Sequence, residues 1–223
     1  MDYLKLIPNL IRRGEHHSDL PMLRDALELC MHFEVDDAVN VDGKIIFDKS
    51  QFDQAHEWSK SIRTIAGKLV REKGVEEALS LYKDSLLFDA PHDLDCALIY
   101  AEWNRDYPKK FYEPRRKQLL PVVKAMQRLD NREIKILGVM MPPGVGKTTL
   151  EIMFAIWSAF RHPELATLMG SHSTSLLRGV YDEIMRMLEP DGEYLWHEIF
   201  PSVGFAGTNA KELQIDLGKR KRF

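Results

Sequence analysis

"GVMMPPGVGKTTLEIMF" (residues 138–154) is the stretch that decides the fold of the second half of this chain. An apolar run ends there in two prolines, and Gly-Val-Gly-Lys-Thr-Thr precedes a segment with helical periodicity. A loop that runs into a helix N-terminus directs several backbone amides and the positive end of the helix dipole at one point. The stretch therefore predicts a phosphate-binding loop (P-loop) between a strand and a helix.

Each residue type in this loop has a predicted role. Gly144 and Gly146 let the backbone approach a phosphate closely. Lys147 is expected to reach the β- and γ-phosphates of ATP, and the hydroxyl of Thr148 to bind Mg²⁺; these two are the predicted catalytic residues. Thr149 offers a second hydroxyl near the α-phosphate. The predicted ATP contacts in the loop are the consecutive residues Pro143, Gly144, Val145, Gly146, Lys147, Thr148 and Thr149.

The match to the pattern G-x-x-x-x-G-K-[ST] is incomplete, because Met141 stands where the first glycine is expected. A glycine turn before an ordinary helix start is the alternative interpretation. The order of an apolar strand, a loop and an amphipathic helix is the context that a P-loop requires. That order favours the phosphate site.

Hydrophobic periodicity divides the chain into two predicted domains. Residues 1–125 are expected to be mostly helical, with a small hairpin near residues 39–47, where Asp42-Gly43 favours a type I′ turn. Residues 126–223 are expected to form a partial P-loop domain. Its predicted strands are the apolar runs 133–141, 165–171 and 212–217.

Helices are predicted between these strands, at about 148–161 and 173–188. Strands that alternate with helices imply right-handed crossovers onto a parallel sheet. The predicted fold class is therefore α/β: a helical N-terminal region followed by the start of a parallel-sheet P-loop ATPase domain of the ASCE type, truncated before its end.

Composition narrows the function classes. Of the 223 residues 29% are charged and 44% hydrophobic, and the net charge of −3 argues against a uniformly basic nucleic-acid coat. Cys30 and Cys96 lie far apart without metal-ligand spacing, which favours a reducing cytoplasm over a disulfide framework. No apolar run approaches the ~18 residues of a membrane span, so no membrane partner is expected.

Three segments resemble the N-terminal part of bacteriophage terminase large subunits, the ATPases that drive DNA into viral capsids. They are "YAEWNRDYPKKFYEPRRKQLLPVV" (100–123), "MPPGVGKTT" (141–149) and "HPELATLMGSHSTSLLRGVYDEIMRML" (162–188). Loops of this family often lack the first glycine, which accounts for Met141. The resemblance covers residues 95–223, whereas residues 1–90 carry no motif that we assign.

The resemblance implies further contacts upstream of the loop, in "FYEPRRKQ" (111–118). Related motor ATPases hold adenine with an aromatic ring and a glutamine. Here Phe111 or Tyr112 would stack on the base, and Gln118 would contact its edge. The alternative is a solvated basic turn after Pro114. For Gln118 the two interpretations are equally weighted.

The resemblance also implies a cellular setting. The cofactors would be ATP and Mg²⁺, and the partners double-stranded DNA, a portal protein and a small terminase subunit. The full-length protein would form a homo-oligomeric ring in the cytoplasm of an infected or lysogenic bacterial host. Two alternatives stay open: a helicase-like P-loop translocase, and a non-hydrolysing, nucleotide-responsive interaction module.

Hydrolysis needs a second element, an apolar strand that ends in acidic residues. "KIIFD" ends at Asp48 but precedes the loop, and "LQID" ends at Asp216 but is followed by Leu217-Gly218. We therefore expect a fragment that binds ATP without hydrolysing it and that lacks the nuclease domain of the family. His172, at the end of a predicted strand, is a candidate sensor of nucleotide state, and Arg178 a candidate arginine finger.

Overall fold

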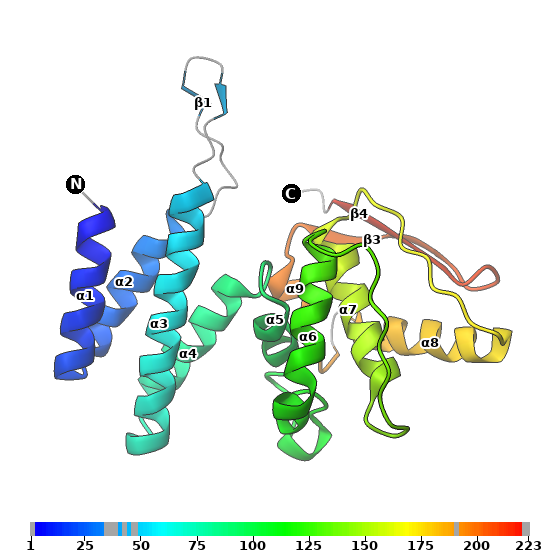
Figure 1. Ribbon diagram of the computed structural model, residues 1–223, viewed down its shortest axis with the longest axis horizontal. Helices are drawn as coiled ribbons and strands as arrows, with labels where there is room; N and C mark the ends of the chain where they lie inside the picture. Colours follow the sequence, from blue (N-terminus) through cyan, green and yellow to red (C-terminus); the bar gives the residue numbers. More distant parts are fainter. Residues whose placement is uncertain (1–2, 34–39, 42–43, 46–48, 190–191, 220–223) are drawn as a thin grey trace. The chain divides into compact units, whose positions relative to one another are not determined.

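The computed structural model describes residues 3–33, 40–41, 44–45, 49–189 and 192–219. The chain divides into two compact units, Met1–Asp89 and Ala90–Phe223 (Figure 1). The domain boundary predicted at 125/126 instead falls within a helix of the second unit. None of the described helices is both long and apolar enough to cross a membrane.

In its described part, the first unit consists of helices and one short hairpin. Its helices are α1 (Tyr3–His17), α2 (Leu20–Met31), α3 (Lys49–Lys73) and α4 (Glu76–Asp89). Asp19 starts α2 as an N-cap whose side chain accepts a hydrogen bond from the amide of Met22, with a proline in the first turn. The helical periodicity predicted for this region is confirmed.

The four helices of the first unit enclose one apolar core. Their inward positions recur at helical spacing, so each helix contributes one stripe. The central buried side chains are Ile7, Leu23, Ala26, Leu27, Cys30, Ala55, Ile62, Ala66 and Leu81.

A buried carboxylate ties α3 to α4 within this unit. Asp89 is only 3% exposed, and its Oδ1 lies 2.6 Å from Nδ1 of His56. Its Oδ2 accepts hydrogen bonds from Ser59, at 3.0 Å, and from Arg63. Because a buried carboxylate is costly unless it is paired, these contacts fix the end of α4 against α3.

The expected hairpin is present as two short strands, β1 (Asn40–Val41) and β2 (Lys44–Ile45). They pair antiparallel, with Val41 opposite Lys44. The predicted type I′ turn at residues 42–43 and the aspartate at position 48 lie outside the described residues.

The second unit is built around α5 (Leu94–Ala101), a helix that is apolar on nearly all sides. All its residues except Asp95 are buried, as expected for a helix at the centre of a core. It contacts α6 (Arg116–Asp130), α7 (Lys147–Arg161) and α9 (Trp196–Ile199). Two 3₁₀ turns, η1 (Tyr107–Lys109) and η2 (Glu113–Arg115), connect α5 to α6.

The apolar face of α7 packs in the core of the second unit. Trp157 is fully buried and donates from Nε1 to the carbonyl of Ala90 at 2.9 Å, and Phe154 lies beside it. At the C-terminal end of the helix, close to Trp157, Asp130 of α6 accepts hydrogen bonds from Ser158 and Arg161, each at 2.5 Å. Helix α8 (Thr174–Met187) in turn packs on α7.

The predicted strands are only partly observed. Residues 133–141 and 165–171 form no strand, and Ile136, Met140 and Leu168 expose 88–97% of their surface. The third run lies in β4 (Gln214–Lys219), which pairs antiparallel with β3 (Val203–Asn209), Thr208 opposite Ile215. The described residues thus contain hairpins and no parallel sheet. An apolar run becomes a strand only where a neighbouring strand completes its hydrogen bonds.

Candidate phosphate-binding site

The loop between α6 and α7 has the backbone of a glycine-dependent turn. Gly144 has φ +80° and Gly146 has φ +91°, in the left-handed region that glycine adopts without strain. Gly146 is also the N-cap residue of α7, and no side chain caps the helix there. The first amides of α7 are therefore not satisfied by a capping side chain, the property that suits a helix N-terminus for an anion.

The side chain of Lys147 folds back across the loop. Its Nζ donates a hydrogen bond to the carbonyl oxygen of Met141 at 3.0 Å. The two residues are six positions apart in the chain, so this contact closes the loop into a ring and holds the ammonium at the loop. Thr148 is exposed and Thr149 is half-buried in the same helical turn, and no acidic residue lies in that turn to repel an anion.

The flank of the loop is covered by an aromatic ring. A Cβ atom added to Gly146 would lie 2.2 Å from Cε2 of Phe111, so the ring occupies the space that a side chain would need. Arg115 donates to the carbonyl of Phe111 at 3.0 Å, and its guanidinium lies 5.5 Å from the centre of the ring. On the side of Gly144, by contrast, a Cβ would meet no atom within 4 Å.

Of the two aromatic residues proposed for the base, only Phe111 lies against the loop. Tyr112 is fully buried, and its hydroxyl donates to Asp95 at 2.6 Å. Burial, followed by this hydrogen bond, raises the pKa of the Tyr112 hydroxyl well above its usual value. Neither face of a fully buried ring is open to a base, which argues against the adenine contact predicted for Tyr112.

The remaining candidates lie on the surface. Gln118 is exposed in the first turn of α6, and no described hydrogen bond joins it to the loop. Arg116, in the same basic segment, forms an ion pair with Asp95 at 2.6 Å. His172, before α8, and Arg178, on α8, are both exposed, and the described contacts bring neither to Lys147.

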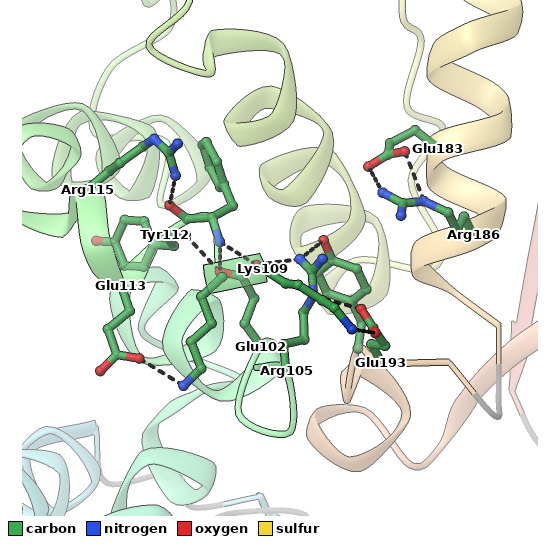
Figure 2. A network of polar contacts seen from close by, with 12 residues as sticks. Glu102, Arg105, Lys109, Tyr112, Glu113, Arg115, Glu183, Arg186 and Glu193 are labelled. Atoms are coloured by element: carbon green, nitrogen blue, oxygen red, sulfur yellow. Dashed lines mark hydrogen bonds and ion pairs between the residues drawn. The ribbon is translucent and has the colours of Figure 1, made fainter. Parts of the chain in front are cut away.

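A buried glutamate organises the segment that carries Phe111, and sequence reasoning did not identify it. Glu102 is 1% exposed and accepts hydrogen bonds from the amides of Phe111 (2.8 and 3.0 Å) and Tyr112 (2.7 Å). It also pairs with Arg105 at 2.8 Å (Figure 2). The sequence feature that could have identified Glu102 is its place directly after α5, a helix whose residues other than Asp95 are all apolar.

The chemical groups at the loop suit an anion rather than a bare metal ion. In the described part of the chain, no three His, Cys, Asp or Glu side chains gather as metal ligands. The groups that face solvent at the loop are instead donors and a hydroxyl: the α7 amides, the ammonium of Lys147 and Thr148. Such a set of donors is suited to phosphate oxygens.

Compared with known proteins, the chain matches no protein-family model, and it has no significant match among curated proteins or solved structures.

Proposed function

We propose that this chain binds the triphosphate of ATP, with Mg²⁺, at residues 143–149, and that it is the ATPase region of a terminase-like DNA-packaging motor. The observation that carries the nucleotide site is the closed loop in which Lys147 reaches the carbonyl of Met141 ahead of an uncapped helix N-terminus. A cation, free amides and glycine backbone converge there, and phosphate is the ligand that uses all three.

Each residue of the loop has a place in this proposal. Gly144 and Gly146 allow the backbone to turn around a phosphate, and the amides of Val145 and Lys147 donate to it. Thr148 would supply a hydroxyl ligand to Mg²⁺, and Thr149 a further donor. Pro143 stiffens the entry to the loop. The metal would neutralise charge on the phosphates.

The parallel sheet of the proposed domain would be built from segments that form no strand in this structure. In a P-loop domain residues 133–141 and 165–171 would be neighbouring buried strands. Their exposed Ile136, Met140 and Leu168 would then be covered by helices on both faces of the sheet, as apolar parallel strands require. This arrangement places the ends of both strands beside the loop.

The packaging role rests on the sequence resemblance. Double-stranded DNA, a portal protein and a small terminase subunit are the partners that it implies, with a homo-oligomeric ring as the working assembly. We expect binding without turnover from this chain, because Asp216 lies exposed on β4 and bonds Gln214 at 2.7 Å instead of following a buried strand.

Isothermal titration of ATP with Mg²⁺ tests the site. Lys147→Ala should weaken binding at least about tenfold, because a charge-assisted hydrogen bond is removed. The matched control is Lys135→Ala, which removes an exposed lysine from the segment before the loop. If wild type and Lys147→Ala bind ATP equally, the phosphate site is not at this loop.

A turnover assay separates the translocase alternative from the two functions that bind ATP without turnover. ATP hydrolysis well above background, stimulated by DNA, would contradict binding without turnover and favour a complete translocase. A non-hydrolysing interaction module has one supporting observation, namely that Met1–Asp89 is a compact unit with its own core. That reading requires nucleotide binding with no turnover in the presence of DNA.

A further inference from the structure

We propose that Glu102 is a positioning residue for the phosphate loop: its carboxylate holds the backbone of Phe111 so that the ring supports Gly146. This inference rests on the proposed phosphate site and adds to it a residue that lies outside the loop. Two contacts connect Glu102 to the loop. The first is the hydrogen bond between Glu102 and the Phe111 amide, and the second is the packing of the Phe111 ring on Gly146.

The carboxylate of Glu102 is a strong anchor. Both of its oxygens accept from the amide of Phe111, one accepts from Tyr112 and the other from Arg105, at 2.7–3.0 Å. Hydrogen bonds to a buried charge are stronger than neutral ones, so the peptide at residues 111–112 is firmly held. The main chain here runs back toward the end of α5, nine residues earlier.

Phe111 transmits this position to the loop. Its ring fills the space beside Gly146, at the point where the loop becomes α7. The residue after Gly146 is Lys147, whose ammonium would meet the phosphates. If the ring withdraws, the loop gains freedom, and ordering it again on binding costs affinity.

Arg105 fixes the other side of the carboxylate. Its guanidinium donates to Tyr194 at 2.5 Å and to Glu193 at 3.1 Å, and it lies 4.5 Å from the centre of the Tyr194 ring. Lys109 also pairs with Glu193, at 3.2 Å (Figure 2). The anchor of Phe111 is thereby supported by the segment that leads into α9.

The experiment measures binding of inorganic tripolyphosphate with Mg²⁺, a probe without a base, so that stacking on adenine cannot contribute. Glu102→Gln keeps the size of the side chain but loses the charge and one acceptor. We expect it and Phe111→Ala each to weaken binding about tenfold, because the loop must then be ordered on binding. The matched control is Glu198→Gln, a half-buried glutamate of the same unit that bonds Tyr100 and not the loop. It should leave tripolyphosphate affinity unchanged.

A double-mutant cycle distinguishes positioning from general destabilisation. If Glu102 acts through Phe111, the double variant binds as weakly as Phe111→Ala alone, whereas independent effects multiply. Multiplied effects, or unchanged or tighter binding by Phe111→Ala, would overturn the proposal. Should Glu102→Gln fail to unfold cooperatively, Glu102→Asp takes its place in the cycle. Failure of the wild-type chain to bind tripolyphosphate would instead refute the phosphate site itself.

Discussion

Gly146 carries two constraints at once, one on its backbone and one on its surroundings. Its φ of +91° disfavours any side chain, and the ring of Phe111 stands where a Cβ would lie. Gly144 shares the first constraint, with φ +80°, but has open space around it. Comparing substitutions at Gly144 and Gly146 therefore separates the cost of backbone strain from the cost of a clash with Phe111.

We expect Gly146→Ala to reduce tripolyphosphate affinity more than Gly144→Ala does. Both substitutions cost about 1–2 kcal/mol for an L-residue in the left-handed region, and only the first also displaces Phe111. Titration calorimetry measures the difference. Gly138→Ala is the control, since its φ is ordinary and no atom lies near the added methyl group. Equal losses at positions 144 and 146 would show that the ring does not support the loop.

The glycine turn and the helix start at the loop could be predicted from sequence, whereas the contacts that support the loop could not. Glycine, lysine and threonine at fixed spacing before a helix form a local pattern, and Gly144, Gly146 and Lys147 lie where that pattern places them. Glu102 contacts the peptide at 111–112 only because two 3₁₀ turns fold the chain back. No local pattern encodes that return, and hydrophobicity does not tell which of Phe111 and Tyr112 faces the core.

A helix of this chain can be predicted from its own residues, whereas a strand also depends on a partner strand. Helix α7 was predicted from about Thr148 to Arg161 and is observed at Lys147–Arg161, because a glycine start and an apolar stripe are internal to the segment. A strand needs a partner. Residues 133–141 are as apolar as a buried strand, yet they have none here, while β4 finds its neighbour β3 directly before it in the chain.

The junction of α6 and α7 depends on Asp130, whose side chain is 1% exposed. It accepts from Ser158 and Arg161 and lies 3.2 Å from Nε2 of His162. Asp130→Ala should lower the free energy of unfolding by about 3–5 kcal/mol, because it breaks a buried charge pair.

Urea unfolding followed by circular dichroism measures this loss. Glu133→Gln provides the comparison, since the pair of Glu133 with Arg128 is about half exposed and is worth at most about 1 kcal/mol. Similar losses for the two variants would show that Asp130 does not hold the helices together.

The free energy of unfolding of the whole molecule depends on pH through the thiol of Cys30, which lies in the core of the first unit. Burial, with a smaller contribution from the charge of Asp89, raises the pKa of Cys30 from 9.0 to about 12. Between these values the unfolded chain loses the proton while the folded chain keeps it. Stability from this group is therefore complete below pH 9 and declines as the pH rises toward 12.

We expect the free energy of unfolding of the wild type, relative to Cys30→Ala, to fall by about 1.4 kcal/mol per pH unit above pH 9. Urea titrations with reductant at pH 8, 9.5 and 10.5 follow the difference. Subtracting the free energy of unfolding of Cys30→Ala from that of the wild type cancels the contributions of tyrosines and lysines, which titrate in both proteins. A difference that stays constant with pH would mean that the thiol ionises equally in both states.

The hydrogen bond between Lys147 and Met141 engages one of the three donors of the ammonium. At the proposed phosphate site, a singly charged ion would gain few contacts, whereas a polyphosphate would engage the remaining ammonium donors and the helix amides together. Under the proposed function, we therefore expect the loop to select anions by charge before any base or sugar is touched, and chloride to compete poorly for it.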